Sequence, residues 1–175
     1  MTMQPGVADE PVKEPLVVFL VRHAEKLDAS RDPVLTAAGK RRANELASTL
    51  RSAKLSQVHS TDLIRTRETA APVAAVHNLP VQLYDARDLP AFVTKLRQTG
   101  GRHLVVGHST TTPGLVKLLG GEAQADFDEA GEFDRLYVLT VGTNGQTIVV
   151  LLRYGQPFQA ASTASSALDA SAIPN

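Results

Sequence analysis

The stretch LVVFLVRHAE, residues 16–25, decides the fold class of this chain. Its first six residues form a continuous apolar run rich in β-branched side chains, which is typical of a strand buried on both faces of a parallel sheet. Arg22, His23 and Glu25 follow where this strand is expected to end. Ligands bind at the C-terminal ends of strands in α/β sheets, so the Arg22–His23 pair is a candidate site.

A second strand end of the same kind lies in the stretch LVVGHST, residues 104–110. His108 follows a strand expected over residues 103–106, and Gly107 permits close backbone approach. Ser109 supplies a hydroxyl at the start of a predicted helix, a position that favours anions. Two strand ends of one sheet converge on one crevice, so we expect His23 and His108 to share a site.

The third candidate region is STDLIRTRETA, residues 60–70. Arg65 falls in the first turn of a helix expected over residues 63–76, where the helix dipole disfavours a cation. This position indicates that its guanidinium faces a negative group. The alternative is a local pair with Asp62 at spacing i, i+3. Arg67 is expected to make only a solvated surface contact.

The remaining segments alternate between helix and strand. Thr36 is expected to cap a helix with an apolar stripe at Ala43, Leu46, Ala47 and Leu50. Further helices are expected after Asp88 and from about residue 113 to 119. Further strands are expected over 57–59 and 81–84, with a hairpin of 135–141 and 147–153 around Asn144-Gly145. The pattern predicts an α/β three-layer sandwich with a mostly parallel sheet and an antiparallel edge.

Length and composition bound the organisation of the chain. The 175 residues are expected to form one domain over residues 16–158, after a flexible acidic leader (1–15) and before an Ala/Ser-rich tail (159–175). The chain has no cysteine, which excludes disulfides, thiol catalysis and zinc-thiolate sites. Eighteen basic residues balance eighteen acidic ones, which argues against nucleic-acid or membrane binding driven by bulk charge.

Targeting signals are weak. The longest apolar runs fall far short of the roughly 20 residues that span a bilayer. Residues 1–14 have neither the basic start nor the apolar stretch of a signal peptide. We therefore expect a cytoplasmic protein, unless a signal was removed before residue 1.

Four stretches together resemble the histidine phosphatase superfamily, in its phosphoglycerate mutase-like branch. They are residues 20–25, 35–39, 60–70 and 105–109, which occur in the family's order within residues 16–121. The resemblance implies a phosphoglycerate mutase-like fold and a covalent phosphohistidine on His23. It also implies that Arg22, Arg65 and His108 surround the phosphate oxygens. Neither a metal nor a cofactor is implied, because arginines stand in place of a divalent ion.

The proton donor and the substrate stay open at this point. Many relatives use a glutamate between the second arginine motif and the second histidine, where this chain has Asp85 and Asp88. Asp85, at a strand's end, is favoured over Asp88, which is placed to cap the next helix, and Glu25 is a third candidate.

The short chain looks like the phosphohistidine phosphatase-type members. Its expected substrate is therefore a phosphorylated small molecule or a phosphoprotein. The alternatives are mutase-type phosphotransfer and a non-catalytic phosphate-binding module. The expected assembly is a monomer, or a weak dimer through the edge hairpin.

Overall fold

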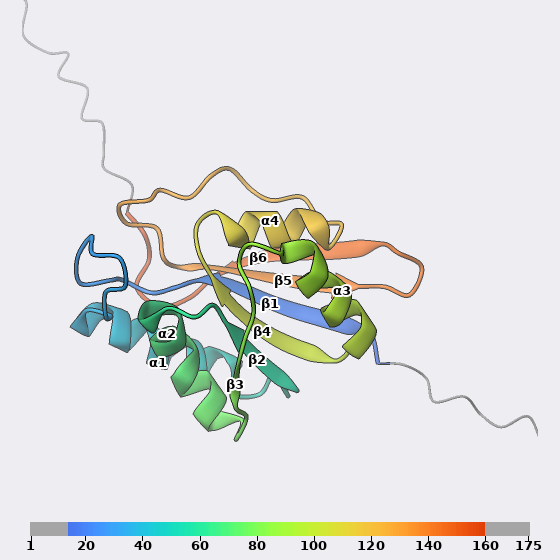
Figure 1. Ribbon diagram of the computed structural model, residues 1–175, viewed down its shortest axis with the longest axis horizontal. Helices are drawn as coiled ribbons and strands as arrows, with labels where there is room; N and C mark the ends of the chain where they lie inside the picture. The colour runs from blue at the N-terminus through green and yellow to red at the C-terminus, as the bar shows by residue number, and fades with distance from the viewer. Residues whose placement is uncertain (1–13, 160–175) are drawn as a thin grey trace, which may run out of the picture.

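The computed structural model describes residues 14–159 and contains one six-stranded sheet (Figure 1). The strands, in the spatial order β3-β2-β4-β1-β5-β6, are Val81–Leu83, Gln57–Ser60, Arg102–Gly107, Leu16–Arg22, Arg135–Val141 and Thr147–Arg153. The first four are parallel, whereas β5 runs antiparallel to both β1 and β6. The predicted mostly parallel sheet with an antiparallel edge is confirmed. The predictions for residues 1–13 and 160–175 lie outside the described residues.

In the described part of the chain, four helices cover the two faces of the sheet: α1 (Ala37–Leu50), α2 (Ile64–Val76), α3 (Leu89–Thr99) and α4 (Thr111–Leu118). Side chains of α1 and α2 share one apolar cluster with one face, and side chains of α3 and α4 share a second cluster with the other. Figure 1 shows the resulting three layers. Within residues 14–159, none of the helices has the length and apolar character needed to cross a membrane.

Local signals account for where most helices begin. The Thr36 hydroxyl accepts a hydrogen bond from the Gly39 N–H at 2.9 Å, and the Asp88 carboxylate accepts one from the Ala91 N–H at 3.1 Å. Both predicted N-caps are therefore confirmed. The helix expected from residue 63 starts at Ile64, and its N–H donates to Asp32 at 2.7 Å. That cap comes from a loop 32 residues earlier, which helix spacing cannot reveal.

The register of β1 against β4 positions the two candidate strand ends. Val18, Leu20 and Val21 are fully or almost fully buried, as the continuous apolar run predicts. The pairing ends with Arg22 opposite Gly107. His23 and His108 therefore leave the sheet at the same edge and the same level.

The hairpin of β5 and β6 closes the other side of the sheet. Gly145 adopts a positive φ of 82° in its turn, a conformation that glycine accepts without strain. The outer strand β6 exposes Ile148, Val150 and Leu152 on one face, while Val149 and Leu151 pack against the core. Dimerisation through this hairpin stays a prediction.

Candidate active site

The structure brings the two predicted histidines together. The His23 N–H donates to the carbonyl of Gly107 at 2.9 Å, which continues the β1–β4 ladder by one residue. The rings of His23 and His108 then lie edge to face, with centroids 5.5 Å apart. His23 is also 6.0 Å from the ring of Phe133, which packs against it. Residues 85 positions apart in the chain thus lie in one small cluster, in which His23 is buried and His108 is partly buried.

Hydrogen bonding fixes the tautomer of His23. Its Nδ1 lies 2.8 Å from the carbonyl oxygen of Ala24, and a carbonyl only accepts, so Nδ1 carries the proton. Burial, reinforced by the nearby Arg22, His108 and Arg65, lowers the pKa of His23 to about 3. The ring is therefore neutral at pH 7 with its lone pair on Nε2. This is the form in which an imidazole acts as a nucleophile.

Arg22 is held by a loop far along the chain. Its Nη1 donates to the carbonyls of Asp128 and Glu132, each at 3.1 Å, and its Nη2 donates to the Glu129 carbonyl at 3.0 Å. The guanidinium stacks over Phe133, with 4.3 Å from its central carbon to the ring centroid. Its Nε is buried and has no hydrogen-bond partner among residues 14–159. The buried guanidinium of Arg22 thus has one N–H donor that no described residue uses.

Arg65 also has a buried donor without a partner among the described residues. Its Nη1 donates to the Arg31 carbonyl at 3.3 Å and lies 4.0 Å from an Asp32 carboxylate oxygen. Its Nε is buried, again with no partner in the described part of the chain. The alternative pair with Asp62 is wrong, because Asp62 forms an ion pair with Arg67 on the surface. The solvated contact predicted for Arg67 is confirmed.

His108 is anchored from the end of β2. Its Nε2 lies 3.0 Å from the hydroxyl oxygen of Thr61, and its backbone N–H donates to the Thr111 hydroxyl at 2.8 Å. Burial, together with the charges of Arg65 and Arg22, lowers the pKa of His108 to about 4. Ser109 lies in the turn between β4 and α4 and is partly buried.

The three candidate proton donors are all engaged in other contacts. Glu25 accepts two hydrogen bonds from Arg42 Nε, at 2.9 and 3.1 Å. Asp88 caps α3, which is the alternative that the sequence left open. Asp85 pairs with Arg87 at 2.9 Å, and these hydrogen bonds lower its pKa to about 2. Asp85 is therefore ionised at neutral pH, and this geometry argues against the proton-donor role that we favoured for it.

Asp85 nevertheless lies beside the site. It lines an open cavity of about 630 Å³ that Thr61 and His108 also line. The rest of the lining combines charged and apolar side chains from three segments: Arg31, Asp62, Leu63, Leu83, Tyr84, Ala86 and Arg87. In the described part of the chain, His, Asp and Glu side chains form no group of three that could hold a metal ion.

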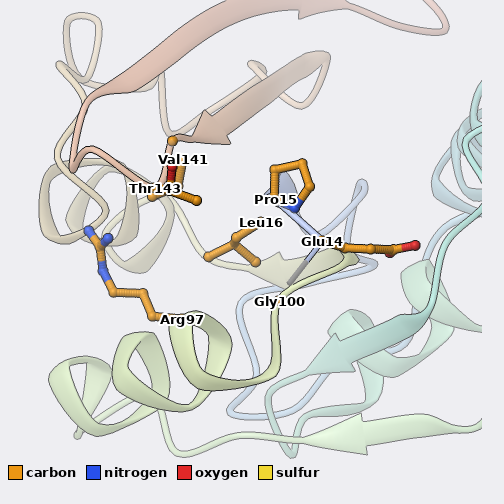
Figure 2. Close-up of a pocket in the computed structure, with 8 residues that line it drawn as sticks. Glu14, Pro15, Leu16, Arg97, Gly100, Val141 and Thr143 are labelled. Atoms are coloured by element: carbon orange, nitrogen blue, oxygen red, sulfur yellow. The ribbon is translucent and has the colours of Figure 1, made fainter. Parts of the chain in front are cut away.

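A separate cavity of about 230 Å³ opens at the other end of β1 (Figure 2). Leu16 lies at its centre, and Arg97 and Glu14 point in different directions around it. Arg97 donates a hydrogen bond to the Leu119 carbonyl at 3.1 Å. None of the candidate catalytic residues lines this cavity.

Sequence reasoning missed several residues that shape the site. The Thr69 hydroxyl accepts from the Ala24 N–H at 3.0 Å and so fixes the chain just after His23. Thr61, which directly follows β2, has no role in the site in the sequence analysis. The loop of residues 128–133, which holds Arg22, had no role assigned. A polar residue directly after a buried strand was the available signal for Thr61, whereas the loop acts mainly through backbone carbonyls and leaves no residue-type signal.

Comparison with known proteins agrees with this geometry. The family model of the histidine phosphatase superfamily (branch 1) matches residues 18–88. A search of curated protein sequences gives no significant match.

Three solved structures illustrate the similarity in fold. The protein histidine phosphatase SixA, complexed with tungstate, is 21% identical with a TM-score of 0.63, and the match covers 79% of this chain and 97% of that one. A phosphoglycerate mutase from Bacillus anthracis str. Sterne is 14% identical with a TM-score of 0.64, covering 80% and 93%. A mycobacterial glucosyl-3-phosphoglycerate phosphatase is 12% identical with a TM-score of 0.59, covering 81% and 99%.

The family match over residues 18–88 and the shared fold agree with the resemblance to the histidine phosphatase superfamily and with a phosphoglycerate mutase-like fold. The three solved structures are all less than 25% identical to this chain, so they show a shared fold.

Proposed function

We propose that this protein is a metal-independent phosphatase that hydrolyses a phosphomonoester or a phosphohistidine through a covalent phosphohistidine on His23. One observation carries the proposal. Two arginines, Arg22 and Arg65, each keep a buried Nε donor without a partner among the described residues, close to a neutral histidine. Buried donors are normally satisfied, so unpaired ones indicate a missing anionic ligand. A phosphoryl group supplies oxygens for both.

The first chemical step is attack by the Nε2 lone pair of His23 on phosphorus. A P–N bond forms while the bond from phosphorus to the leaving group breaks, and the leaving group takes the electron pair. The transferring phosphoryl group spreads its charge over its oxygens. Arg22 and Arg65 stabilise that charge with donors that are already in place.

The second step returns the enzyme to its starting state. Water attacks the phosphohistidine, the P–N bond breaks, and inorganic phosphate leaves. Nδ1 of His23 keeps its hydrogen bond to Ala24 throughout, so the same tautomer is regenerated. Covalent transfer in this way divides one difficult hydrolysis into two easier steps.

The cavity beside His108 is where we place the leaving group of the substrate. Its volume of about 630 Å³ and its mixed lining suit a phosphorylated small molecule or the side chain of a phosphoprotein. Since Asp85 is paired with Arg87, substrates whose leaving groups need little protonation are favoured. A phosphohistidine is such a substrate.

The test is release of inorganic phosphate from p-nitrophenyl phosphate with excess chelator, in the wild type and in His23→Ala. Activity that survives the chelator and disappears in the variant supports the proposal. Activity that persists in the variant contradicts it. A panel of phosphohistidine proteins and small phosphate esters then identifies the substrate, and phosphate retained in an organic product would indicate a mutase instead.

A further inference from the structure

A chain of hydroxyl groups ends on His108. The Thr61 hydroxyl lies 3.0 Å from His108 Nε2 and 2.9 Å from the Thr66 hydroxyl. Thr66 in turn lies 2.9 Å from the Leu63 carbonyl and 3.1 Å from the Thr61 carbonyl. Thr61 and Thr66 are both buried, so these bonds are shielded from exchange with solvent.

The two carbonyls at the end of this chain favour one set of hydrogen-bond directions. A carbonyl only accepts, so Thr66 donates its one hydroxyl proton to them. The Thr66 oxygen then accepts from the Thr61 hydroxyl. Thr61 has thereby used its own proton, and its oxygen accepts from His108. With these directions, Nε2 of His108 carries a hydrogen.

We infer that Thr61 is a positioning residue that keeps a hydrogen on His108 Nε2 and so leaves Nδ1 as the ring nitrogen that meets the phosphoryl group. In the neutral ring, Nδ1 carries a lone pair, which cannot donate to a phosphate oxygen. His108 therefore takes up a proton from solvent on Nδ1 when a phosphate dianion binds, and a new N–H···O bond forms. The bond from Nε2–H to Thr61 is kept in both states.

The surroundings of His108 are consistent with this coupling. Arg65, Arg22 and His23 face the ring, and the two arginines oppose a further positive charge while the site is empty. Asp62, Asp85, Arg31 and Arg87 line the adjoining cavity. A bound dianion adds negative charge directly at the ring. This charge favours the protonated form of His108, which the two arginines disfavour in the empty site. The inference has two halves. Its structural half, the hydrogen on Nε2 of His108 in the ligand-free protein, does not depend on the proposed function. Its coupled half, the proton uptake when a phosphate dianion binds, rests on the proposed function.

Nitrogen-15 NMR of the imidazole rings tests the structural half without any turnover. In the ligand-free protein at pH 7, His108 is expected to be neutral with hydrogen on Nε2. The same is expected in Thr61→Ser, which retains the hydroxyl, whereas Thr61→Val is expected to lose this fixed tautomer. Hydrogen on Nδ1 in the wild type, or an unchanged tautomer in a folded Thr61→Val, overturns the inference even if the phosphatase proposal holds.

The coupled half is tested with saturating inorganic phosphate at pH 8. His108 of the wild type is expected to become doubly protonated, and a ring that stays neutral with phosphate bound overturns the proton uptake. For p-nitrophenyl phosphate, kcat/KM is expected to fall roughly tenfold or more in Thr61→Val, with a changed pH profile, and to recover in Thr61→Ser. If the wild type neither binds phosphate nor turns over, the proposed function fails, and the ligand-free tautomer still decides the role of Thr61.

Discussion

Nη2 of Arg22 lies 3.1 Å from a carboxylate oxygen of Glu129, 107 residues further along the chain. The two ends of this pair differ in exposure. The Arg22 side chain is only 3% exposed and is also held by backbone carbonyls, whereas the Glu129 side chain is 67% exposed. The arginine is therefore also held by contacts that do not depend on the carboxylate. The negative charge of Glu129 thus lies beside the Arg22 guanidinium, the cation that the proposed phosphoryl group needs.

Replacing Glu129 with Gln should tighten the binding of inorganic phosphate. The change removes a charge that repels the dianion and competes for Nη2. Exposed ion pairs contribute about 0–1 kcal/mol, so the inhibition constant of phosphate should fall by up to about fivefold. Glu122→Gln removes the same charge from an exposed position earlier in the same segment and serves as the control. A weaker inhibition by phosphate in Glu129→Gln would show that this carboxylate assists binding.

Arg65 and Arg67 form a matched pair on one helix. Arg65 is mostly buried with an unsatisfied Nε, whereas Arg67 is exposed and bound to Asp62. Arg65→Ala is expected to lower kcat/KM by about 10²–10³, the usual loss for a donor that stabilises charge in the transition state. Arg67→Ala should change it little. Steady-state kinetics on the two purified variants checks this, and equal effects would contradict the assignment.

Variants at Asp85 and Asp88 distinguish a catalytic role from a role in helix capping. Asp85→Asn should lower kcat by less than about threefold, because an ionised carboxylate already paired with Arg87 has no proton to give. Asp88→Ala should leave kcat unchanged and cost about 1 kcal/mol of stability through the lost cap of α3. Kinetics and urea denaturation measure the two effects. A loss of 10² or more in Asp85→Asn would restore it as the proton donor.

Buried neutral histidines make stability depend on pH. Burial lowers the pKa of His23 and His59 to about 3 and that of His108 to about 4, from an ordinary value of 6.5. Between these values the unfolded chain binds more protons than the folded one, so the free energy of unfolding falls as the pH drops below about 6.5. Each group contributes up to about 1.4 kcal/mol per pH unit.

His59, which is not one of the candidate site residues, contributes to the same pH dependence of stability. Its ring is stacked on His103, with Nε2 of His59 3.0 Å from Nδ1 of His103. Urea midpoints at pH 7.5 and pH 5 test the prediction for the whole protein. A midpoint that is equal or higher at pH 5 would mean that these rings are already charged in the folded state.

The sheet and helices could be predicted because their signals are local. The apolar run before Arg22, the caps at Thr36 and Asp88 and the Asn144-Gly145 turn each act within a few residues. The meeting of His23 and His108 could also be anticipated, since both follow buried strands of one sheet. In both cases a short sequence pattern is enough, because general rules of backbone geometry determine where the element or the strand end lies.

The partners of the site residues could not be predicted in the same way. The local pair of Arg65 with Asp62 was only the alternative, and the carboxylate nearest to Arg65 is that of Asp32, on the loop before α1, which the sequence did not indicate. Arg22 is held mainly by backbone carbonyls, which every residue possesses. The partner of Asp85 is Arg87, only two residues away, but the sequence analysis did not predict this pair.

Trapping the phosphoenzyme tests the central claim most directly. The wild type is mixed rapidly with a phosphorylated substrate, quenched in denaturant at high pH and analysed by mass spectrometry. The account predicts one added phosphoryl group on His23, stable to base, labile to acid and absent from His23→Ala. Phosphate that is stable to acid, or that is found on Ser, Thr or another histidine, would contradict it.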